Sequence, residues 1–241
     1  MRLGDPAMSA FIPFWAMLVL ALGTMLLGFS QGSVPGWFGG IRVAAQALSG
    51  ALPAMVALLT AGVFAGGFRW SAFAGAQSAS PLHWTAFSNP FQFVAFIVFV
   101  ISGLVLLGIA PMDGAHAAPD LHGGVSSHLY GRRLSLFRLG RFYGFFFWSV
   151  IAVVLFLGAW RLPFGLQEAL GDSFSSGVLQ LAEMAWLLSK TYVLMLVVVW
   201  IARVNPRSRV DQVTDFSWKV LSPFSLFALI GASIWAGWGA F

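Results

Sequence analysis

The chain has no cysteine and very little charge. Its 241 residues include 13 Lys and Arg and 8 Asp and Glu, so that charged residues make up 9%, against about 25% in ordinary soluble domains. The missing cysteines exclude disulfides, thiolate metal ligands and a cysteine nucleophile. So few charges cannot cover in water a chain that is 59% hydrophobic. The solvent for most of the surface must therefore be lipid.

Several functional patterns are also missing. The sequence contains no glycine-rich phosphate loop next to a strand and no hydrolytic triad. The formal net charge is +5, but the basic residues fall in short loops. That distribution is typical of membrane topology, whereas a nucleic-acid-binding protein carries a basic stripe on one face. We therefore expect no nucleic-acid partner.

The chain does have six long apolar runs. Each is long enough to cross a hydrocarbon core of about 30 Å, which takes roughly 20 helical residues. Backbone groups cannot stay unpaired in lipid and alternating strands are absent, so the runs predict helices. The sequence predicts an all-α polytopic membrane protein with one transmembrane domain over residues 1–241. Its spans are expected near 10–29, 43–68, 91–112, 142–160, 178–202 and 220–240.

Two local patterns in these runs bear on the fold. The first run follows Arg2, but it covers about twenty residues and no small-x-small cleavage site comes after it. We therefore interpret it as a retained helix and not as a signal peptide. Gly62 and Gly66 form a GxxxG pattern, which permits close approach of two helices.

Charge asymmetry predicts the orientation of the bundle. Loops two apart in sequence share a side of the membrane, and basic residues gather on the side that is cytoplasmic. The other side has only Arg2, Arg69 and Arg161. We expect both termini on the outer, periplasmic side and the following residues on the inner side: Arg42, Arg132, Arg133, Arg138, Arg141, Arg203, Arg207, Arg209 and Lys219.

The segment between the last two spans is unusually rich in charge and carries a specific pattern. It reads ARVNPRSRVDQVTDFSWKVLSPFSL and closely resembles the H subunit of NADH–quinone oxidoreductase (respiratory complex I) and its relatives in membrane-bound hydrogenases. The positions that fit the family pattern are Arg203, Pro206, Arg207, Arg209, Asp211, Gln212, Trp218, Lys219, Leu221 and Pro223.

Further matches follow in the family's order from about residue 10 to the end. FGGIRVAAQALSGALP places Arg42 and Gln46 on matching positions, APMDGAHAAPDLHGG resembles the family's Ala-Pro-Phe-Asp loop, and Lys190 falls where the family has a lysine. The family has eight transmembrane helices, and this chain resembles the last six. In the family the other two help to form the mouth through which quinone enters. An even number of missing helices leaves every loop on its expected side.

The resemblance implies a membrane-arm subunit of a proton-translocating complex in the cell inner membrane. Such a subunit anchors the peripheral electron-transfer arm and lines part of the quinone site. Its partners are other membrane-arm subunits and iron–sulfur-bearing peripheral subunits. The resemblance implies quinone bound at an interface, no cofactor held by this chain alone and no complete active site in it. Candidates for the quinone chamber or proton path are Arg42, Gln46, Asp113, His116, Asp120, Glu183 and Lys190.

The chain departs from the family mainly in its acids. Ala51, Leu106 and His116 stand where the family has glutamates, and Arg141 reverses the sign of another. A proton path needs titratable groups or water at short intervals. One alternative is therefore a structural paralogue in a complex I-like or hydrogenase assembly, without quinone or proton function. A stand-alone transporter is a further alternative, although the two halves of the chain show no repeat.

Glu183 and Lys190 are the charges well inside a span. Seven residues apart, they share a helix face about 10 Å apart along the axis, so they do not pair directly. Either they function in the membrane, or Glu183 reaches the interface and Lys190 snorkels or meets a carbonyl.

Histidines cluster in the loop after the third span. His116, His122 and His128, with Asp113 and Asp120, do not have the spacing of a compact metal motif, so we expect no metal site. His116 titrates near neutral pH and is a hypothetical proton carrier.

The charged loop between the last two spans also has two interpretations. Its charges either hold the loop in the cytoplasm, or they form a surface that docks the peripheral arm, a role that suits arginine. Its candidate docking residues are Arg203, Arg207, Arg209, Asp211, Gln212, Asp215, Trp218 and Lys219.

Overall fold

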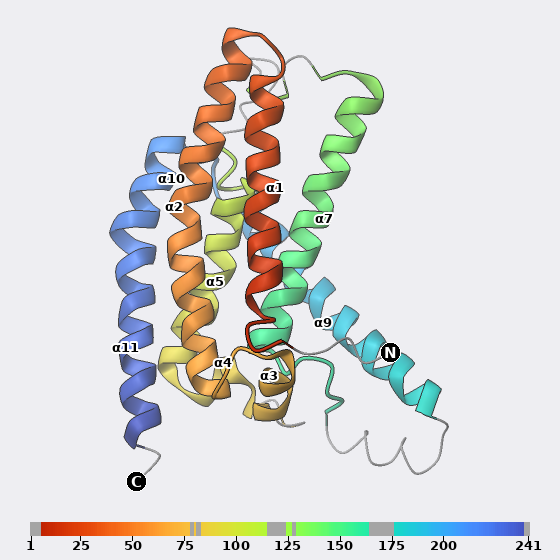
Figure 1. Cartoon of the computed structure of the whole chain (residues 1–241), viewed down its shortest axis with the longest axis vertical. Coiled ribbons are helices and arrows are strands. Elements are labelled where there is room, and N and C mark those ends of the chain that lie inside the picture. The colour runs from red at the N-terminus through yellow and green to blue at the C-terminus, as the bar shows by residue number, and fades with distance from the viewer. Residues whose placement is uncertain are drawn as a thin grey trace.

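The structure, a computed structural model, describes residues 6–77, 80, 83–114, 124–126, 129–163 and 176–238. Every regular element within these ranges is a helix (Figure 1). Six helices are long and apolar enough to cross a membrane, so the predicted all-α membrane class is confirmed. They are α1 (Phe11–Phe29), α2 (Val34–Ala65), α5 (Pro90–Leu107), α7 (Gly131–Phe156), α9 (Ser176–Val204) and the continuous helix formed by α10 (Val210–Phe216), η2 (Ser217–Leu221) and α11 (Ser222–Trp238).

Several helices begin or end at residues other than the ends of the apolar runs, because caps and glycines decide where a helix stops. α2 begins nine residues before the expected span, at Val34, because Ser33 caps it by accepting the Gly36 N–H at 3.3 Å. α7 begins at Gly131, eleven residues early, so its first turns carry arginines beyond the apolar run. α5 ends at Leu107 because Gly108 adopts the left-handed conformation (φ 59°).

The centre of the bundle is formed by α2, α5 and α7. In an apolar 18-residue stretch of each of these helices, between half and two thirds of the residues are buried. In the corresponding stretches of α1, α9 and α10–α11, only 22–28% of the residues are buried. Small residues such as Ala57 and Ala95 let α2 and α5 approach closely. The rings of Phe99 and Trp148 stack at 4.4 Å between α5 and α7. The outer helices therefore expose their apolar faces to lipid or to partner subunits.

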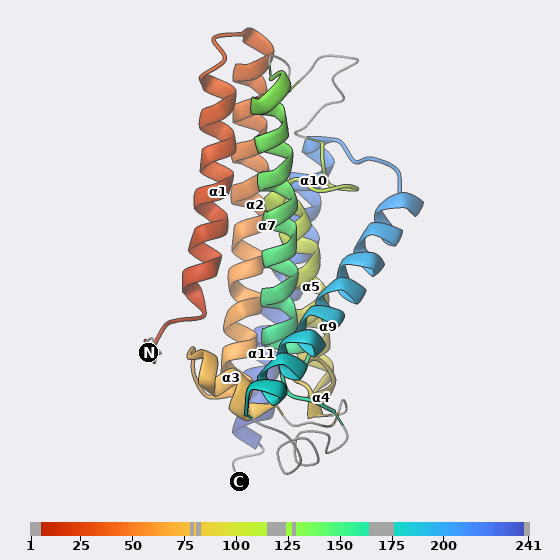
Figure 2. The same cartoon turned by 90° about the vertical axis from the view of Figure 1, so that its right-hand side faces the viewer.

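α9 leans away from the rest of the bundle (Figure 2). Its main packing partner is α7. Large apolar side chains are exposed on it, including Met184, Val193 and Trp200. A helix that is apolar all round and largely unpacked requires lipid or another protein around it.

The last span contains a π-helical turn, η2, in its first half. Pro223 lacks the N–H that would bond to the carbonyl of Lys219, so a regular α-helix cannot continue there. The π turn shifts the backbone hydrogen-bond pattern by one residue, so the Ser222 N–H donates to the carbonyl of Ser217. π turns of this kind occur often at functional sites.

The two ends of the bundle differ in their connections. The short helices α3 (Trp70–Ala76) and α4 (Thr85–Ser88) lie at one end of the bundle, together with the start of α1 and the end of α11. The α1–α2 turn, the loop after α5 and the start of α10 lie toward the opposite end. α1, α2 and α7 extend beyond the tops of α5 and α10 (Figures 1 and 2), and we call this step between the helix ends the ledge. The arrangement has the loop alternation expected from the sequence, and the outward orientation of the termini stays a prediction.

Candidate functional site

The loop that follows α5 is held by side chains from two other helices. Gln46 of α2 is 1% exposed, and its Nε2 donates to Val105 O at 2.9 Å and also to Met112 O. Arg141 of α7 donates to the carbonyl of Gly108. Cationic and amide donors suit this position, because the last carbonyls of a helix lack partners inside the helix. Residues 108–114 are thereby fixed on the ledge.

Asp113 links this loop to the segment between α9 and α11. Its carboxylate, 8% exposed, accepts from Arg207 at 2.5 Å, while the Arg207 side chain is 59% exposed. The Ser208 N–H donates to Pro111 O at 3.1 Å. A Cβ on Gly114 would lie 2.6 Å from Ser208 O, so the two backbones touch there. One buried acid and one close backbone contact therefore hold residues 207–208 against the bundle.

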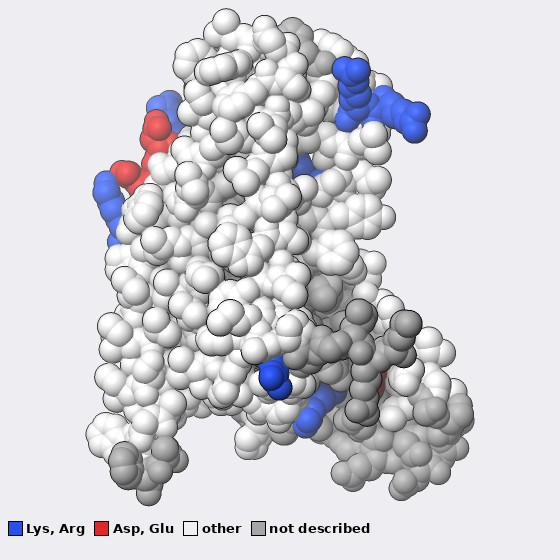
Figure 3. All heavy atoms as spheres, in the orientation of Figure 1, with Lys and Arg blue, Asp and Glu red and all other residues white. Residues whose placement is uncertain are grey.

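We call residues 203–219 the rim segment. Its charged side chains and Gln212 are exposed, and Ser217 is buried. Figure 3 shows basic and acidic groups together along this edge, over α10. Lys219 and Asp215 form an exposed pair at 2.5 Å, and Gln212 Oε1 accepts the Arg209 N–H at 3.1 Å. The exposed predicted docking residues are Arg203, Arg207, Arg209, Asp211, Gln212, Asp215, Trp218 and Lys219.

A small cavity lies beneath the ledge, between α1, α2, α5 and α7. Its volume is about 20 Å³, and Thr24, Gln46 and Arg141 contribute its polar groups. Gln46 Oε1 and Arg141 Nε are buried without a hydrogen-bond partner among the described residues. One is an acceptor and the other a donor. A cavity of this size holds about one water molecule.

Arg141 was not among the residues that the sequence predicted for the site. Its guanidinium lies near enough to Asp113 and Arg207 to interact electrostatically with both. The signal in the sequence is an arginine ten residues inside a helix that continues into an apolar run. Such a charge needs a polar partner from another helix, which here is the end of α5.

Lys190 lies near the opposite end of the bundle. Its Nζ donates to Leu157 O at 2.7 Å and to Ala159 O at 2.6 Å, just past the end of α7. The nitrogen also lies 4.9 Å from the centre of the Trp84 ring and 5.7 Å from that of Trp186. The sequence left open whether Lys190 functions in the membrane or snorkels or meets a carbonyl, and the structure shows contacts with two carbonyls. Favourable charge at a helix C-terminus and cation–π attraction both stabilise these contacts.

The remaining predicted residues are not gathered at one point. Arg42 is exposed on α2, four residues before the buried Gln46. Glu183 is half-buried on α9. His116 and Asp120 lie outside the described residues, as do His122 and His128. No group of three His, Asp or Glu side chains that could hold a metal occurs in the described part of the chain.

Comparison with known proteins places this architecture in a family. Residues 3–233 match the family model described as NADH dehydrogenase. The chain belongs to the NADH dehydrogenase family. The match covers almost the whole chain, and it confirms the resemblance that the rim segment indicated.

Relatives of known name within the NADH dehydrogenase family are similar over most of this chain. The H subunit of the NADH-quinone oxidoreductase of Anaeromyxobacter dehalogenans is 34% identical over 225 residues, 90% of this chain and 54% of the relative. The corresponding H subunit of Chlorobaculum parvum is 30% identical over 231 residues, 92% and 63% respectively. The H subunit of Paramagnetospirillum magneticum is 32% identical over 208 residues, which are 86% of this chain and 56% of the relative. The chain thus spans a little over half to just under two thirds of the length of these relatives.

Proposed function

We propose that this chain is a membrane-arm component, of the H-subunit type, of a proton-translocating NADH–quinone oxidoreductase in the cell inner membrane. In this role it anchors the peripheral electron-transfer arm and does not complete an active site alone. Family membership supports the class of complex. The observation that carries the anchoring role is the rim segment, which is fixed to the bundle through Arg207 and Asp113 while its other charged side chains are exposed.

The chemistry of the rim segment suits a protein partner. Exposed arginines present planar donors that bind carboxylates and carbonyls of a second chain. Trp218, 54% exposed, adds the kind of aromatic contact that is enriched at interfaces. Asp211 and Asp215 give the surface both signs of charge, which favours specific pairing and discourages non-specific adhesion.

The quinone site would be shared with partner subunits. The cavity at Gln46 and Arg141 holds about one water molecule, so a quinone ring does not fit there within the described part of this chain. Gln46, Asp113 and Arg141 lie under the ledge. They would form one wall of a chamber that a partner closes.

The test is purification of the native complex through an affinity tag on this chain in mild detergent, followed by identification of its partners. Iron–sulfur-bearing subunits and quinone reductase activity would support the proposal. A nickel-bearing partner would move the chain to a hydrogenase-type assembly. Recovery of the chain as a stable oligomer of itself, with no redox subunit, would contradict it and favour a stand-alone transporter.

A second candidate is a structural paralogue that occupies the same place without proton transfer. The packing of α2 on α5 favours it. A Cβ on Gly50 would lie 2.9 Å from Leu106 N, so the two helices touch there. Leu106, 3% exposed, puts an apolar side chain at a position where the resemblance implies a glutamate. In the purified complex, quinone reduction coupled to proton uptake would support the working subunit. An assembled complex with neither activity would support the paralogue.

A further inference from the structure

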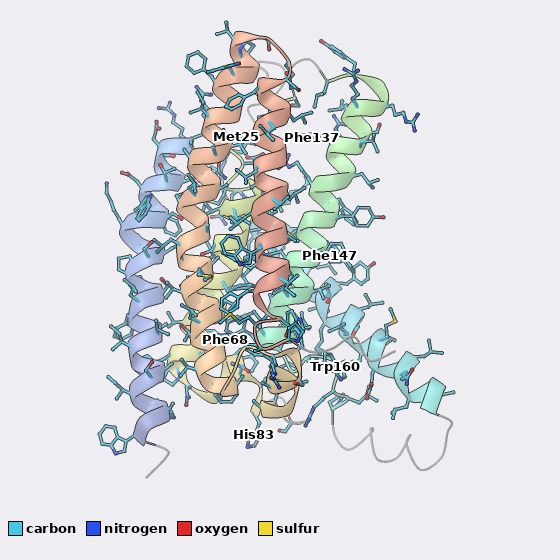
Figure 4. The ribbon with its side chains drawn as sticks, in the orientation of Figure 1. Met25, Phe68, His83, Phe137, Phe147 and Trp160 are labelled. Atoms are coloured by element: carbon cyan, nitrogen blue, oxygen red, sulfur yellow. The ribbon has the colours of Figure 1, made fainter. Side chains whose placement is uncertain are left out.

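A hollow lies between α1 and α7 on the side of the bundle that carries α3. Its volume is about 470 Å³, and all the residues that line it are apolar. Met17 of α1 and Phe147 and Ile151 of α7 form its walls, and Trp70 and Trp160 lie at its end. Figure 4 labels Phe147 in the lower half of α7 and Trp160 below it. Both helices are long and apolar enough to cross a membrane, so the hollow lies within the depth of the hydrocarbon core.

The hollow extends along only part of the length of α1 and α7, and so through only part of the thickness of the bilayer. α1 and α7 touch at Leu20 and Gly144, where a Cβ on the glycine would lie 2.7 Å from Leu20 Cδ2. This contact is near the middle of both helices, and it closes the hollow on the side of the ledge. A transmembrane helix needs roughly 20 residues of continuous depth. An acyl chain needs one leaflet, so the shape of the hollow fits a lipid tail.

The open end of the hollow has the chemistry of a headgroup site. Trp70 and Trp160 have the indole rings that prefer the membrane–water interface. Arg69 and Arg161 are their direct neighbours in sequence. Arg69 is exposed and Arg161 is half-buried, and neither forms an ion pair with any residue the structure describes. Two arginines beside the mouth of an apolar groove complement a phosphate.

We propose that this groove binds one acyl chain of an anionic phospholipid, whose phosphate is held by Arg69 and Arg161. The lipid would belong to the leaflet on the side of α3 and α4. It would fill the gap between α1 and α7, two helices with little direct packing between them. The bound lipid would therefore act as part of the packing between these helices.

The test replaces Phe147 with the photoreactive analogue p-benzoylphenylalanine in the full chain, which is purified with its partners in detergent before irradiation. Purification removes bulk lipid, so a retained lipid gives a phospholipid adduct at position 147. Phe224, exposed on α11 outside the groove, is the matched control and should give little adduct. An adduct to a polypeptide, no adduct at position 147, or equal lipid adducts at both positions would overturn the proposal.

A second variant tests the headgroup. Arg69→Gln with Arg161→Gln should lower the yield of anionic-lipid adduct by roughly fivefold for each arginine removed. Arg132→Gln with Arg133→Gln, at the other end of α7, is the matched control and should leave the yield unchanged. The same yield in the Arg69 and Arg161 variant as in the native chain would refute phosphate binding.

Discussion

Lys190 is held inside the bundle by contacts that ordinary sequence patterns do not reveal. Its ammonium meets two carbonyls past the end of α7 and the faces of two tryptophans. Gln77 serves the same helix end, because its Nε2 donates to Val154 O and Leu155 O at 3.1 Å each. Polar groups at this depth need such partners, since lipid offers none. Lys190 therefore caps the C-terminal end of α7.

Lys190→Met should destabilise the protein by about 2 kcal/mol, because two buried carbonyls lose a charged donor. The measurement is the free energy of unfolding in detergent micelles. Lys219→Met is the control, since it removes only an exposed pair with Asp215 and should cost at most about 0.5 kcal/mol. A Lys190→Met protein of normal stability that has lost turnover would instead indicate a proton-carrying role.

At the residue scale the sequence indicated which polar residues matter, but it did not indicate the groups with which they form hydrogen bonds. Gln46, Asp113 and Lys190 are all buried, as expected of functional or structural polar groups in a membrane bundle. Arg141 was missed as a site residue because its partner, the carbonyl of Gly108, comes from a different helix. A single sequence carries no record of such a tertiary contact.

The helices are packed through glycine at a few points of very close approach. Gly103 of α5 faces the indole of Trp148, and a Cβ there would overlap the ring. The indole Nε1 donates to Phe99 O at 3.3 Å, which keeps the ring in place. The α5–α7 interface therefore depends on the absence of a side chain at position 103.

Gly103→Ala should destabilise the bundle by about 1–3 kcal/mol, the usual range for an overpacked core. Gly140→Ala, in α7, is the control because a Cβ there meets no atom within 4 Å. It should be neutral or stabilise by up to about 1 kcal/mol, as expected for alanine in a helix. Thermal unfolding of both variants in the same detergent makes the comparison. Equal stability of the two would disprove the tight packing at Gly103.

At the element scale, hydropathy located all six spans but not all of their ends. Apolar runs reflect the lipid-facing length, whereas caps and glycines decide where the backbone stops being helical, as at Ser33 and Gly108. The GxxxG pattern was a weaker guide. Gly66 ends α2 in the left-handed conformation (φ 68°), and the close approach of α1 and α2 involves Gly28 and Gly36 instead.

The whole molecule separates its charges between two ends. The rim segment and the arginines at the start of α7 lie toward one end, whereas Arg69 lies at the start of α3, at the other end. Positive charge on the inner side is the general rule for membrane proteins. The absence of cysteine makes this orientation easy to measure with single introduced thiols.

His83→Cys should react with a membrane-impermeant maleimide in intact cells, because His83 is exposed at the end that carries the termini (Figure 4). Arg132→Cys, exposed at the start of α7, should react only after the membrane is made permeable. The reverse pattern of labelling would place the rim segment outside and contradict its proposed role in binding a cytoplasmic arm.

The most direct test of the docking role reverses charge on the rim segment without touching its anchor. Arg203→Glu with Arg209→Glu changes two exposed side chains and leaves the Arg207–Asp113 pair intact. Placing like charges opposite each other at an interface costs several kcal/mol of binding free energy. The amount of iron–sulfur subunits recovered per tagged chain should therefore fall about tenfold or more. The membrane subunits should stay bound, and the control Arg132→Glu with Arg133→Glu should retain both. Undiminished recovery of the iron–sulfur subunits with the rim variant would contradict the proposed docking surface.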